Sequence, residues 1–242
     1  MSSGHRHPIS TLISDIVSIF SKMGFAVAEG PEIESEWYNF DALNVPADHP
    51  SRDMQDTFFI KGRDKTVLRT HTSPVQVRYL EAHKDKLPIR IIVPGKVYRN
   101  EATDATHEAQ FYQVEGLMVG EGVTLANLKA VLERFFTELF GKKLSVRLRA
   151  GFFPFVEPGV EVDMECFKCE GKGCALCKKT GWIEIMGAGM VHPTVLKNAG
   201  VDLEKYQGFA FGTGIDRLAI LKWGIDDVRL MYNGDLRFIN QF

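Results

Sequence analysis

The segment VYRNEATDATHEAQFYQVEG, residues 97–116, constrains the fold and function of this chain more than any other. Two runs with strand-like composition flank a polar stretch, which predicts two neighbouring strands joined by a loop. Alternate side chains of a strand share one face, so Arg99 and Glu101 are expected to point the same way, as are Gln113 and Glu115. Such a face is a poor structural surface. It suits a ligand that carries phosphates, an aromatic ring and an ammonium group.

A second segment, GFAFGTGIDRLAIL (residues 208–221), argues against the simpler interpretation of that hairpin as a surface with solvated charges. It predicts a strand with spaced glycines, followed by a helix that begins near Ile215. Gly212 and Gly214 lack the side chains that would keep a ligand at a distance. Arg217 falls in the first helical turn, where the helix dipole does not favour a cation, so an anion facing it is the better explanation.

These segments resemble the signature motifs of class II aminoacyl-tRNA synthetases. The strand with Arg99 and Glu101 is similar to their motif 2, and the strand and helix that lead to Arg217 are similar to motif 3. The segment GFAVAEGP, residues 24–31, resembles motif 1, with Pro31 at its characteristic proline.

From about His5 onward the chain also resembles, more narrowly, the alpha subunit of bacterial phenylalanyl-tRNA synthetases. The resemblance implies an α+β fold, in which a mainly antiparallel sheet is flanked by helices and residues 1–242 form one catalytic domain. The family normally begins with a long helical arm, so we expect either a trimmed chain, with residues 1–8 as a linker remnant, or a naturally minimal domain. Four further motifs carry this resemblance: THTSPVQVR (70–78), FFPFVEPG (152–159), GAGMVHP (187–193) and GFAFG (208–212).

Hydrophobic periodicity agrees with an α+β fold. Gly24 and Gly141 are placed to end two of the predicted helices, and Ser73 is placed to cap a third. The polar segment NVPADHPSR, residues 44–52, is expected to be a surface loop. Helices are predicted at 9–20, 73–83 and 124–140, and strands at 89–93, 144–149, 182–186 and 209–211.

Composition excludes few classes of protein. A chain of 242 residues with 45% hydrophobic content can bury a sizeable core. It has no membrane-span-length apolar run and no signal-peptide-like start, which favours a cytoplasmic location. The net charge of −2 provides no global positive field to attract nucleic acid.

The resemblance also implies how ATP would be bound. When a carboxylate attacks the α-phosphorus, the site must stabilise charge on the pentacovalent phosphorus and on the leaving pyrophosphate. Arg99 would hold the α-phosphate and the substrate carboxylate, and Arg217 would face the γ-phosphate or adenine from the opposite side. Phe111 would stack on adenine, Glu101 would accept from its amino group, and His107 would approach the phosphates. No general base is required, because the substrate carboxylate is already ionised at neutral pH.

Selection of phenylalanine would depend on an aromatic slot. By the resemblance, Phe153 and Phe155 flank the substrate ring and Ala210 limits its para position. A slot of this kind rejects a tyrosine hydroxyl only modestly, so proofreading is expected elsewhere, and the family places it on the beta subunit. The remaining phenylalanine-binding residues would be His71, Ser73 and Gln76 along the approach, and Gln113 and Glu115 at the ammonium group.

Two metals are predicted. Glu157 corresponds to the family's magnesium-binding glutamate, and Glu161 and Asp163 are nearby alternatives with suitable oxygen ligands. Asp216 stands where the family usually has a glutamate, and its shorter side chain argues against a metal role there.

All four cysteines form two CxxC pairs in a short insertion, which predicts a structural zinc knuckle in a cytosolic protein. A redox dithiol, an iron–sulfur site and free thiols are the alternatives. The predicted zinc ligands are Cys166, Cys169, Cys174 and Cys177.

The sequence therefore predicts an ATP-dependent ligase that makes phenylalanyl-adenylate and passes phenylalanine to tRNA(Phe). Its expected partner is the beta subunit in an (αβ)₂ assembly, with contact through residues 9–31. A class II relative that makes an adenylate for another acceptor, and a catalytically silent paralogue acting as a scaffold, are the alternatives. The scaffold is disfavoured because it would have no need to keep buried charges that are costly to desolvate.

Overall fold

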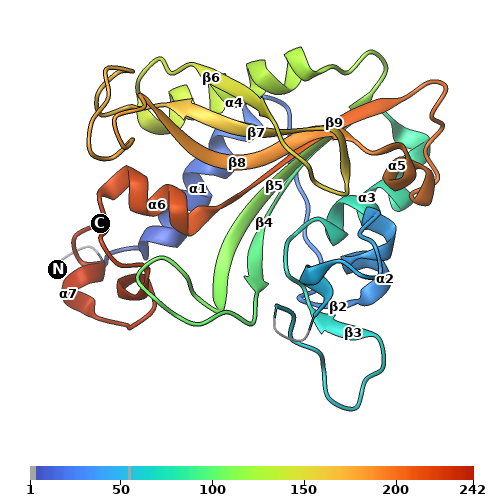
Figure 1. The fold of residues 1–242 in the computed structure, drawn as a ribbon, viewed down its shortest axis with the longest axis horizontal. Coiled ribbons are helices and arrows are strands. Elements are labelled where there is room, and N and C mark those ends of the chain that lie inside the picture. Colours follow the sequence, from blue (N-terminus) through green and yellow to red (C-terminus); the bar gives the residue numbers. More distant parts are fainter. Residues whose placement is uncertain (1–3, 54–55) are drawn as a thin grey trace.

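A seven-stranded sheet forms the centre of the computed structural model, which describes residues 4–53 and 56–242 (Figure 1). Neighbouring strands are antiparallel except at one edge, where β1 pairs with β4 in parallel. This confirms the prediction of a mainly antiparallel sheet. In spatial order the strands are β1 (Ala26–Val27), β4 (Ile89–Tyr98), β5 (Gln110–Gly120), β9 (Gln207–Gly214), β8 (Trp182–Val191), β7 (Val156–Glu165) and β6 (Val146–Ala150). A separate two-stranded antiparallel sheet pairs β2 (Ile33–Ser35) with β3 (Thr66–Leu68).

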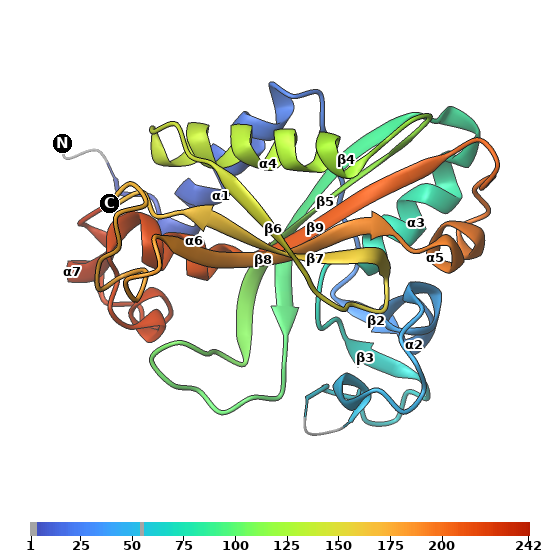
Figure 2. The ribbon, with the colours of Figure 1, turned by 45° about the horizontal axis from the view of Figure 1, so that its top comes forward.

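Helices pack on both faces of the large sheet. The two long helices α1 and α4 lie against one face, as Figure 2 shows, and Phe20, Phe135 and Phe209 are fully buried between them and the strands. The opposite face has a second core, beneath α3 and α5. No helix in the described ranges has both the length and the apolar character that a membrane span requires. The helices are α1 (Pro8–Ser21), α2 (Glu36–Asn39), α3 (Pro74–His83), α4 (Leu125–Phe140), α5 (Pro193–Asn198), α6 (Ile215–Trp223) and α7 (Leu236–Ile239).

The predicted helices are confirmed. Residues at their ends explain where they begin and stop. Thr124 forms a capping box with Asn127 at the start of α4, and Gly141 takes the left-handed conformation after its last residue, with φ of +67°. Pro74 begins α3 directly after Ser73. The predicted Ser73 cap is wrong, because its hydroxyl donates to Glu115 and makes no capping hydrogen bond.

The strands differ more from the sequence predictions. Strand β4 ends at Tyr98, so Arg99 and Glu101 lie on the loop that follows and not on a strand. Strand β7 was not predicted, although buried Val160, Val162 and Met164 alternate along it. Strands β8 and β9 are longer than predicted, because pairing with each other and with their neighbours extends them through glycine-rich sequence.

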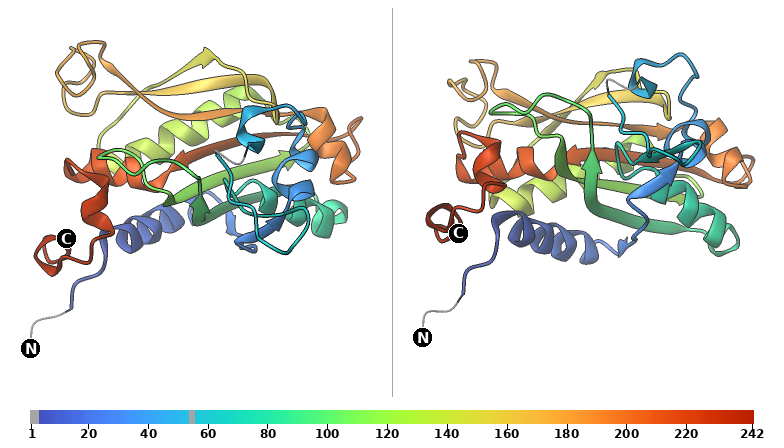
Figure 3. Two further views of the ribbon diagram at one scale, coloured as in Figure 1. Left: turned by 60° about the horizontal axis from the view of Figure 1, so that its bottom comes forward. Right: turned by 90° about the horizontal axis from the view of Figure 1, so that it is seen from below.

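The two ends of the described chain lie side by side, as both views in Figure 3 show. His7 caps α1 by accepting from the backbone N–H of Ile9, and its Nε2 lies 2.7 Å from the carbonyl oxygen of Met231. His5 Nδ1 lies 3.0 Å from the carbonyl oxygen of Phe242. His5 and His7 belong to the predicted linker remnant, of which the first three residues lie outside the described ranges. In the structure these histidines contact the C-terminal segment.

Candidate functional site

A cavity of about 590 Å³ opens on the sheet face opposite α1 and α4. Strands β5, β8 and β9 form its floor, and the start of α3 and the loop before β7 form its walls. It is large enough for an amino acid or a nucleotide. Ten residues predicted to bind substrates line it: His71, Ser73, Gln76, Arg99, Glu101, Gln113, Glu115, Phe153, Phe155 and Ala210.

Glu115 is the buried acidic group of this cavity. Its side chain is only 4% exposed, and it accepts hydrogen bonds from the backbone N–H of Thr72 at 3.0 Å, from Gln76 Nε2 at 2.7 Å and from the Ser73 hydroxyl. Burial raises the pKa of Glu115, although these donors favour the charged form. No cation among the described residues pairs with it. A ligand ammonium group would supply the missing positive charge.

Two buried polar atoms of the cavity lining have no hydrogen-bond partner among the described residues. They are Gln113 Oε1 and His71 Nδ1, and both residues line the cavity. Burial and the positive charge of Arg99 lower the pKa of His71 to about 3, so its ring is neutral at physiological pH. Unpaired buried polar atoms are costly, and their presence in a cavity is the arrangement expected where a polar ligand completes the hydrogen bonds.

Arg99 supplies positive charge in the same cavity. Its Nε donates to the carbonyl oxygen of Thr70 at 3.3 Å, its Nη1 lies 3.9 Å from Glu101 Oε1, and its Cζ lies 5.1 Å from the centre of the Phe111 ring. These contacts leave much of the guanidinium fork free for an anion. Phe111 itself lies two residues before Gln113 on β5 and does not line the cavity.

Aromatic rings and glycines shape the apolar part of the cavity. The Phe153 and Phe155 rings are 6.1 Å apart between centroids, with an interplanar angle of 24°. Gly187 on β8 pairs with Gly212 on β9, and both line the cavity. A Cβ atom on Gly187 would lie 2.7 Å from Cζ of Phe153, so a bare backbone is needed for the ring to lie over it. Ala210, two residues before Gly212 on β9, adds a small buried side chain to the cavity lining.

Arg217 lies in a different cavity from Arg99. This second cavity has a volume of about 420 Å³ and is lined by residues of β6, β7, β8 and the cysteine insertion. Arg217 Nη2 donates to the carbonyl oxygen of Glu184 at 2.8 Å, and no described carboxylate pairs with it. The structure thus does not bring the two predicted catalytic arginines into one cavity.

His107 also lies away from both cavities. It is exposed on the loop between β4 and β5, and its Nδ1 lies 3.0 Å from Asp104 Oδ2. The hydrogen bonds from the backbone N–H and hydroxyl of Thr106, together with His107, lower the pKa of Asp104. These contacts give the tip of the loop a defined turn.

The sequence missed one wall of the first cavity. Val45, His49 and Ser51 line it, although the segment 44–52 was predicted to be a surface loop. Asn44, in the left-handed conformation with φ of +60°, donates from Nδ2 to the carbonyl oxygen of Pro154 at 2.8 Å. That bond ties the segment to the loop that carries Phe153. The one local sign in the sequence that this segment lines the cavity was an apolar residue, Val45, in an otherwise polar stretch. In the structure Val45 is buried.

Of the acids proposed as magnesium ligands, two are already paired. Asp163 is 2% exposed and accepts from Arg147 and Arg149, and these two cations lower its pKa against the effect of burial. Glu161 lies 2.7 Å from Arg149 Nη1. Glu157 is exposed, pairs with no described cation and lines neither cavity. Only Glu157 therefore keeps its carboxylate available.

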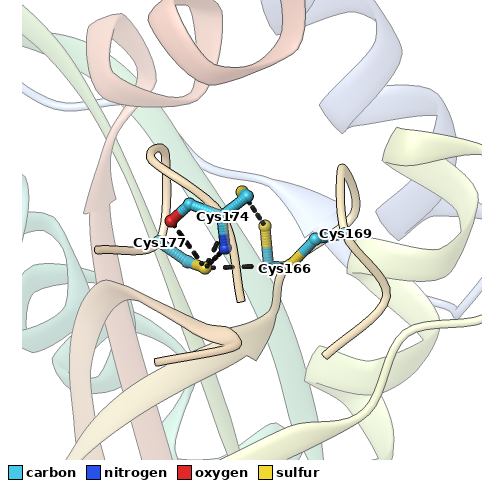
Figure 4. A group of neighbouring side chains, drawn as sticks. All are labelled: Cys166, Cys169, Cys174 and Cys177. Carbon is cyan, nitrogen blue, oxygen red and sulfur yellow. Dashed lines mark hydrogen bonds between the residues drawn. The ribbon is translucent and has the colours of Figure 1, made fainter. Parts of the chain in front are cut away.

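The four cysteines come together in space, as Figure 4 shows. Their Sγ atoms all lie within 4.8 Å of one another, and three of the separations are 3.7, 3.7 and 3.8 Å. A tetrahedron of sulfurs about 2.3 Å from zinc has edges of about 3.8 Å, so the arrangement fits the metal. Burial opposes ionisation of the Cys177 thiol, but backbone N–H groups of Cys174 and Gly181 outweigh it and lower its pKa to about 6. We call residues 166–180 the knuckle, which is the predicted insertion 166–177 together with the three residues that follow it.

Comparison with known proteins identifies the family. The family model for the tRNA synthetases class II core domain (F) matches residues 1–242. The chain is 56% identical over 240 residues to the phenylalanine–tRNA ligase alpha subunit of Bacillus licheniformis, covering 99% of this chain and 69% of that protein. It is 54% identical over 242 residues to the corresponding subunit of Geobacillus kaustophilus, covering 100% of this chain and 70% of that one.

The fold is shared more widely. The crystal structure of pyrrolysyl-tRNA synthetase from Desulfitobacterium hafniense superposes with a TM-score of 0.72, covering 95% of this chain and 74% of that one, at 18% sequence identity. At that level of identity the likeness concerns the fold alone. Together, the matching family model and the high identity to the bacterial subunits show that this chain belongs to the class II tRNA synthetases, among the phenylalanine–tRNA ligase alpha subunits.

Proposed function

We propose that this chain is an aminoacyl-tRNA ligase that activates phenylalanine with ATP and transfers it to tRNA(Phe). The observation that carries the proposal is the position of Glu115 in an aromatic-walled cavity, buried, hydrogen-bonded and without a cationic partner among the described residues. A free amino acid offers the ammonium group that this carboxylate lacks. The high identity to phenylalanine–tRNA ligase alpha subunits supports phenylalanine as that amino acid.

Phenylalanine would lie with its ammonium group at Glu115 and Gln113 and its ring against Phe153 and Phe155. The unpaired Gln113 Oε1 would accept one ammonium hydrogen, and the neutral His71, with Ser73 and Gln76 nearby, would line the approach. In this orientation Ala210 would face the para position. Because an apolar wall discriminates only weakly against one added hydroxyl, exclusion of tyrosine at this step would be incomplete.

Arg99 would hold the substrate carboxylate beside the α-phosphate, which places the attacking oxygen and the phosphorus together and balances the developing charge. Glu101 and Phe111 would hold the adenine, through its amino group and its ring. Arg217, with no carboxylate partner, would bind the far end of the triphosphate or the adenine from the second cavity. His107, on the loop between the two strands, would reach the phosphates if that loop folds over the nucleotide.

Two metals complete the proposal. Glu157 would contribute one oxygen ligand to Mg²⁺, which usually keeps several waters and phosphate oxygens as its other ligands and neutralises phosphate charge. The four cysteines would hold a structural Zn²⁺, since a set of four thiolates leaves no open position for chemistry.

The assembly would be (αβ)₂, because the relatives are named alpha subunits and the motif 1 region is open to contact. Val27 lies in the edge strand β1 and is 42% exposed, and Trp37 in the nearby α2 is 47% exposed. The enzyme would act in the cytoplasm, where tRNA is charged for translation.

Phenylalanine-dependent ATP–pyrophosphate exchange, measured with and without a beta subunit, tests this function. We expect exchange with phenylalanine and loss of about a hundredfold or more in kcat/KM for Arg99→Ala, because a charge-stabilising donor is removed. Exchange with another amino acid, but none with phenylalanine, would contradict the specificity. Exchange without transfer to tRNA would favour an adenylate-forming relative with another acceptor, and complete inactivity with the partner present would favour a silent scaffold.

A further inference from the structure

The knuckle carries a local concentration of positive charge. Residues 166–180 contain four lysines and one glutamate, in a chain whose net charge is −2. The glutamate, Glu170, is paired with Lys142 at 3.3 Å. Five exposed lysines of the knuckle and the adjoining turn form no ion pair with a described residue: Lys143, Lys168, Lys172, Lys178 and Lys179. Even with a formal charge of −2 for four thiolates around a divalent metal, this region keeps an excess of positive charge.

The backbone of the knuckle holds these lysines in a fixed arrangement. Glu170, Lys178 and Lys179 have φ values of +51°, +50° and +63°, a conformation that residues with side chains rarely adopt. The backbone N–H of Gly173 donates to Cys169 Sγ at 3.2 Å, and Cys166 is fully buried beneath the loop. The knuckle projects from the ends of β7 and β8, at the upper left of Figure 1. Its lysines are therefore presented on a preorganised support.

The knuckle adjoins the second cavity. Leu176, Lys178 and Thr180 line this cavity together with Arg217. Trp182 lines it as well, with the Arg147 guanidinium 4.7 Å from its ring centre. Strand β8 then runs from Trp182 to Gly187 in the floor of the first cavity. A positively charged surface with an aromatic side chain thus leads toward the amino-acid site.

We propose that the knuckle is a contact surface for the phosphate backbone of tRNA near its acceptor end. The proposal rests on the aminoacylation function, which requires the 3′ end of a polyanion to reach the first cavity. Exposed lysines bind phosphates as mobile point charges, and they do so without reading sequence. Because the net charge of this chain is −2, a local positive surface of this kind would supply phosphate contacts that no overall positive field provides.

The test uses the complete alpha–beta enzyme and the triple variant Lys168→Glu, Lys172→Glu, Lys179→Glu, whose residues line neither cavity. The matched control is the triple variant Lys61→Glu, Arg63→Glu, Lys65→Glu, at exposed basic residues before β3 that form no ion pair with a described residue. We measure aminoacylation of tRNA(Phe) at several salt concentrations, ATP–pyrophosphate exchange, metal content and subunit assembly. Exchange and aminoacylation by the unaltered enzyme are measured first, so that failure of the proposed function is seen separately.

We expect KM for tRNA to rise about tenfold or more in the knuckle variant, with exchange and assembly unchanged. The slope of log kcat/KM against log salt should become shallower by about 0.7–0.9 for each phosphate that the altered side chains no longer neutralise. A second variant with glutamine at the same positions should show a smaller loss in the same direction, with metal content retained. Unchanged tRNA kinetics would overturn the proposal. So would a loss of subunit assembly, which would make this surface a protein interface, or an equal loss in the control variant.

Discussion

Tyr232 donates a hydrogen bond to the buried carboxylate of Asp216, whose other oxygen accepts the backbone N–H of Tyr112 at 2.8 Å. Asp216 lies in the first turn of α6, beside Arg217, and Tyr112 lies between Phe111 and Gln113 on β5. The C-terminal segment is thereby connected to the strand that would hold both adenine and the amino acid. Burial raises the pKa of Asp216 although both donors favour its ionised form. This carboxylate is committed to a structural contact and is not free for a metal.

Replacing Tyr232 with phenylalanine should weaken the attachment of the C-terminal segment. Loss of the hydroxyl leaves a buried carboxylate oxygen without its donor, which should lower the free energy of unfolding by about 1–3 kcal/mol. Because Tyr112 shares that carboxylate, KM for ATP in the exchange reaction should also rise severalfold. Tyr79→Phe is the control, since no hydrogen bond of its hydroxyl occurs in the described structure. Equal stability of the two variants would show that the Tyr232 hydroxyl contributes little.

The affinity for phenylalanine should depend on pH through Glu115. Burial raises its pKa in the free protein, whereas a bound ammonium group favours the charged form, so binding should release a proton. Affinity should therefore increase as pH rises from the ordinary glutamate pKa through the raised one, while the ammonium group of the amino acid keeps its charge. Calorimetric titration in buffers of different ionisation enthalpy measures the released proton.

The variant Glu115→Gln provides the control for that titration. It should bind phenylalanine about a hundredfold more weakly, because the ammonium group loses its charged partner, and the proton release should disappear. The stability of the free protein should depend on pH in the opposite direction to the affinity for phenylalanine. The folded state holds the proton more tightly than the unfolded state, so the Glu115 contribution to stability falls as pH rises from the ordinary glutamate pKa toward the raised one. Proton release that persists in the variant would assign the titration to another group.

Gly187→Ala should impair the site without unfolding the protein. The added Cβ would meet the far end of the Phe153 ring, which can move, so we expect a higher KM for phenylalanine and a nearly unchanged melting temperature. Gly189→Ala is the contrasting variant. There the Cβ would lie 2.4 Å from the Pro158 carbonyl oxygen, which is backbone and cannot move easily, so stability should fall. Thermal melts and exchange kinetics of both variants separate the two effects.

Ala210→Gly should widen the amino-acid site. Removing one methyl group from the floor of the cavity should admit phenylalanines with a small para substituent, visible as exchange activity with those analogues. The buried Ala199, which does not line the cavity, provides the control variant Ala199→Gly. An unchanged range of substrates in the Ala210 variant would place the para position elsewhere.

Purified protein should contain about one zinc ion per chain, held by the cysteine cluster. Cys174→Ser should lower the metal content and the melting temperature, because the four-thiolate site is closed and contributes to folding. The chain has no cysteine outside the cluster, so every thiol that titrates on chelation reports on this site. Iron in place of zinc would indicate an iron–sulfur site, and no metal at all would indicate a redox dithiol or free thiols.

The sequence by itself determined the elements whose ends depend on neighbouring residues. Helix α3 begins at a proline, and α4 begins after a capping threonine and ends before a left-handed glycine. The alternation along β5 puts Gln113 and Glu115 on one face. The recognisable motifs also identified ten of the residues that line the first cavity. These features are local, because backbone geometry and side-chain spacing within a few residues fix them.

Only the tertiary structure decided which of these residues meet. It separated Arg217 from the cavity of Arg99, brought Val45 to that cavity through the Asn44 hydrogen bond, and added strand β7 to the sheet. It also gave Asp216 a structural partner in Tyr232, across a loop that no periodicity describes. Each of these outcomes depends on contacts between segments distant in sequence, where packing and the satisfaction of buried polar groups outweigh local preference.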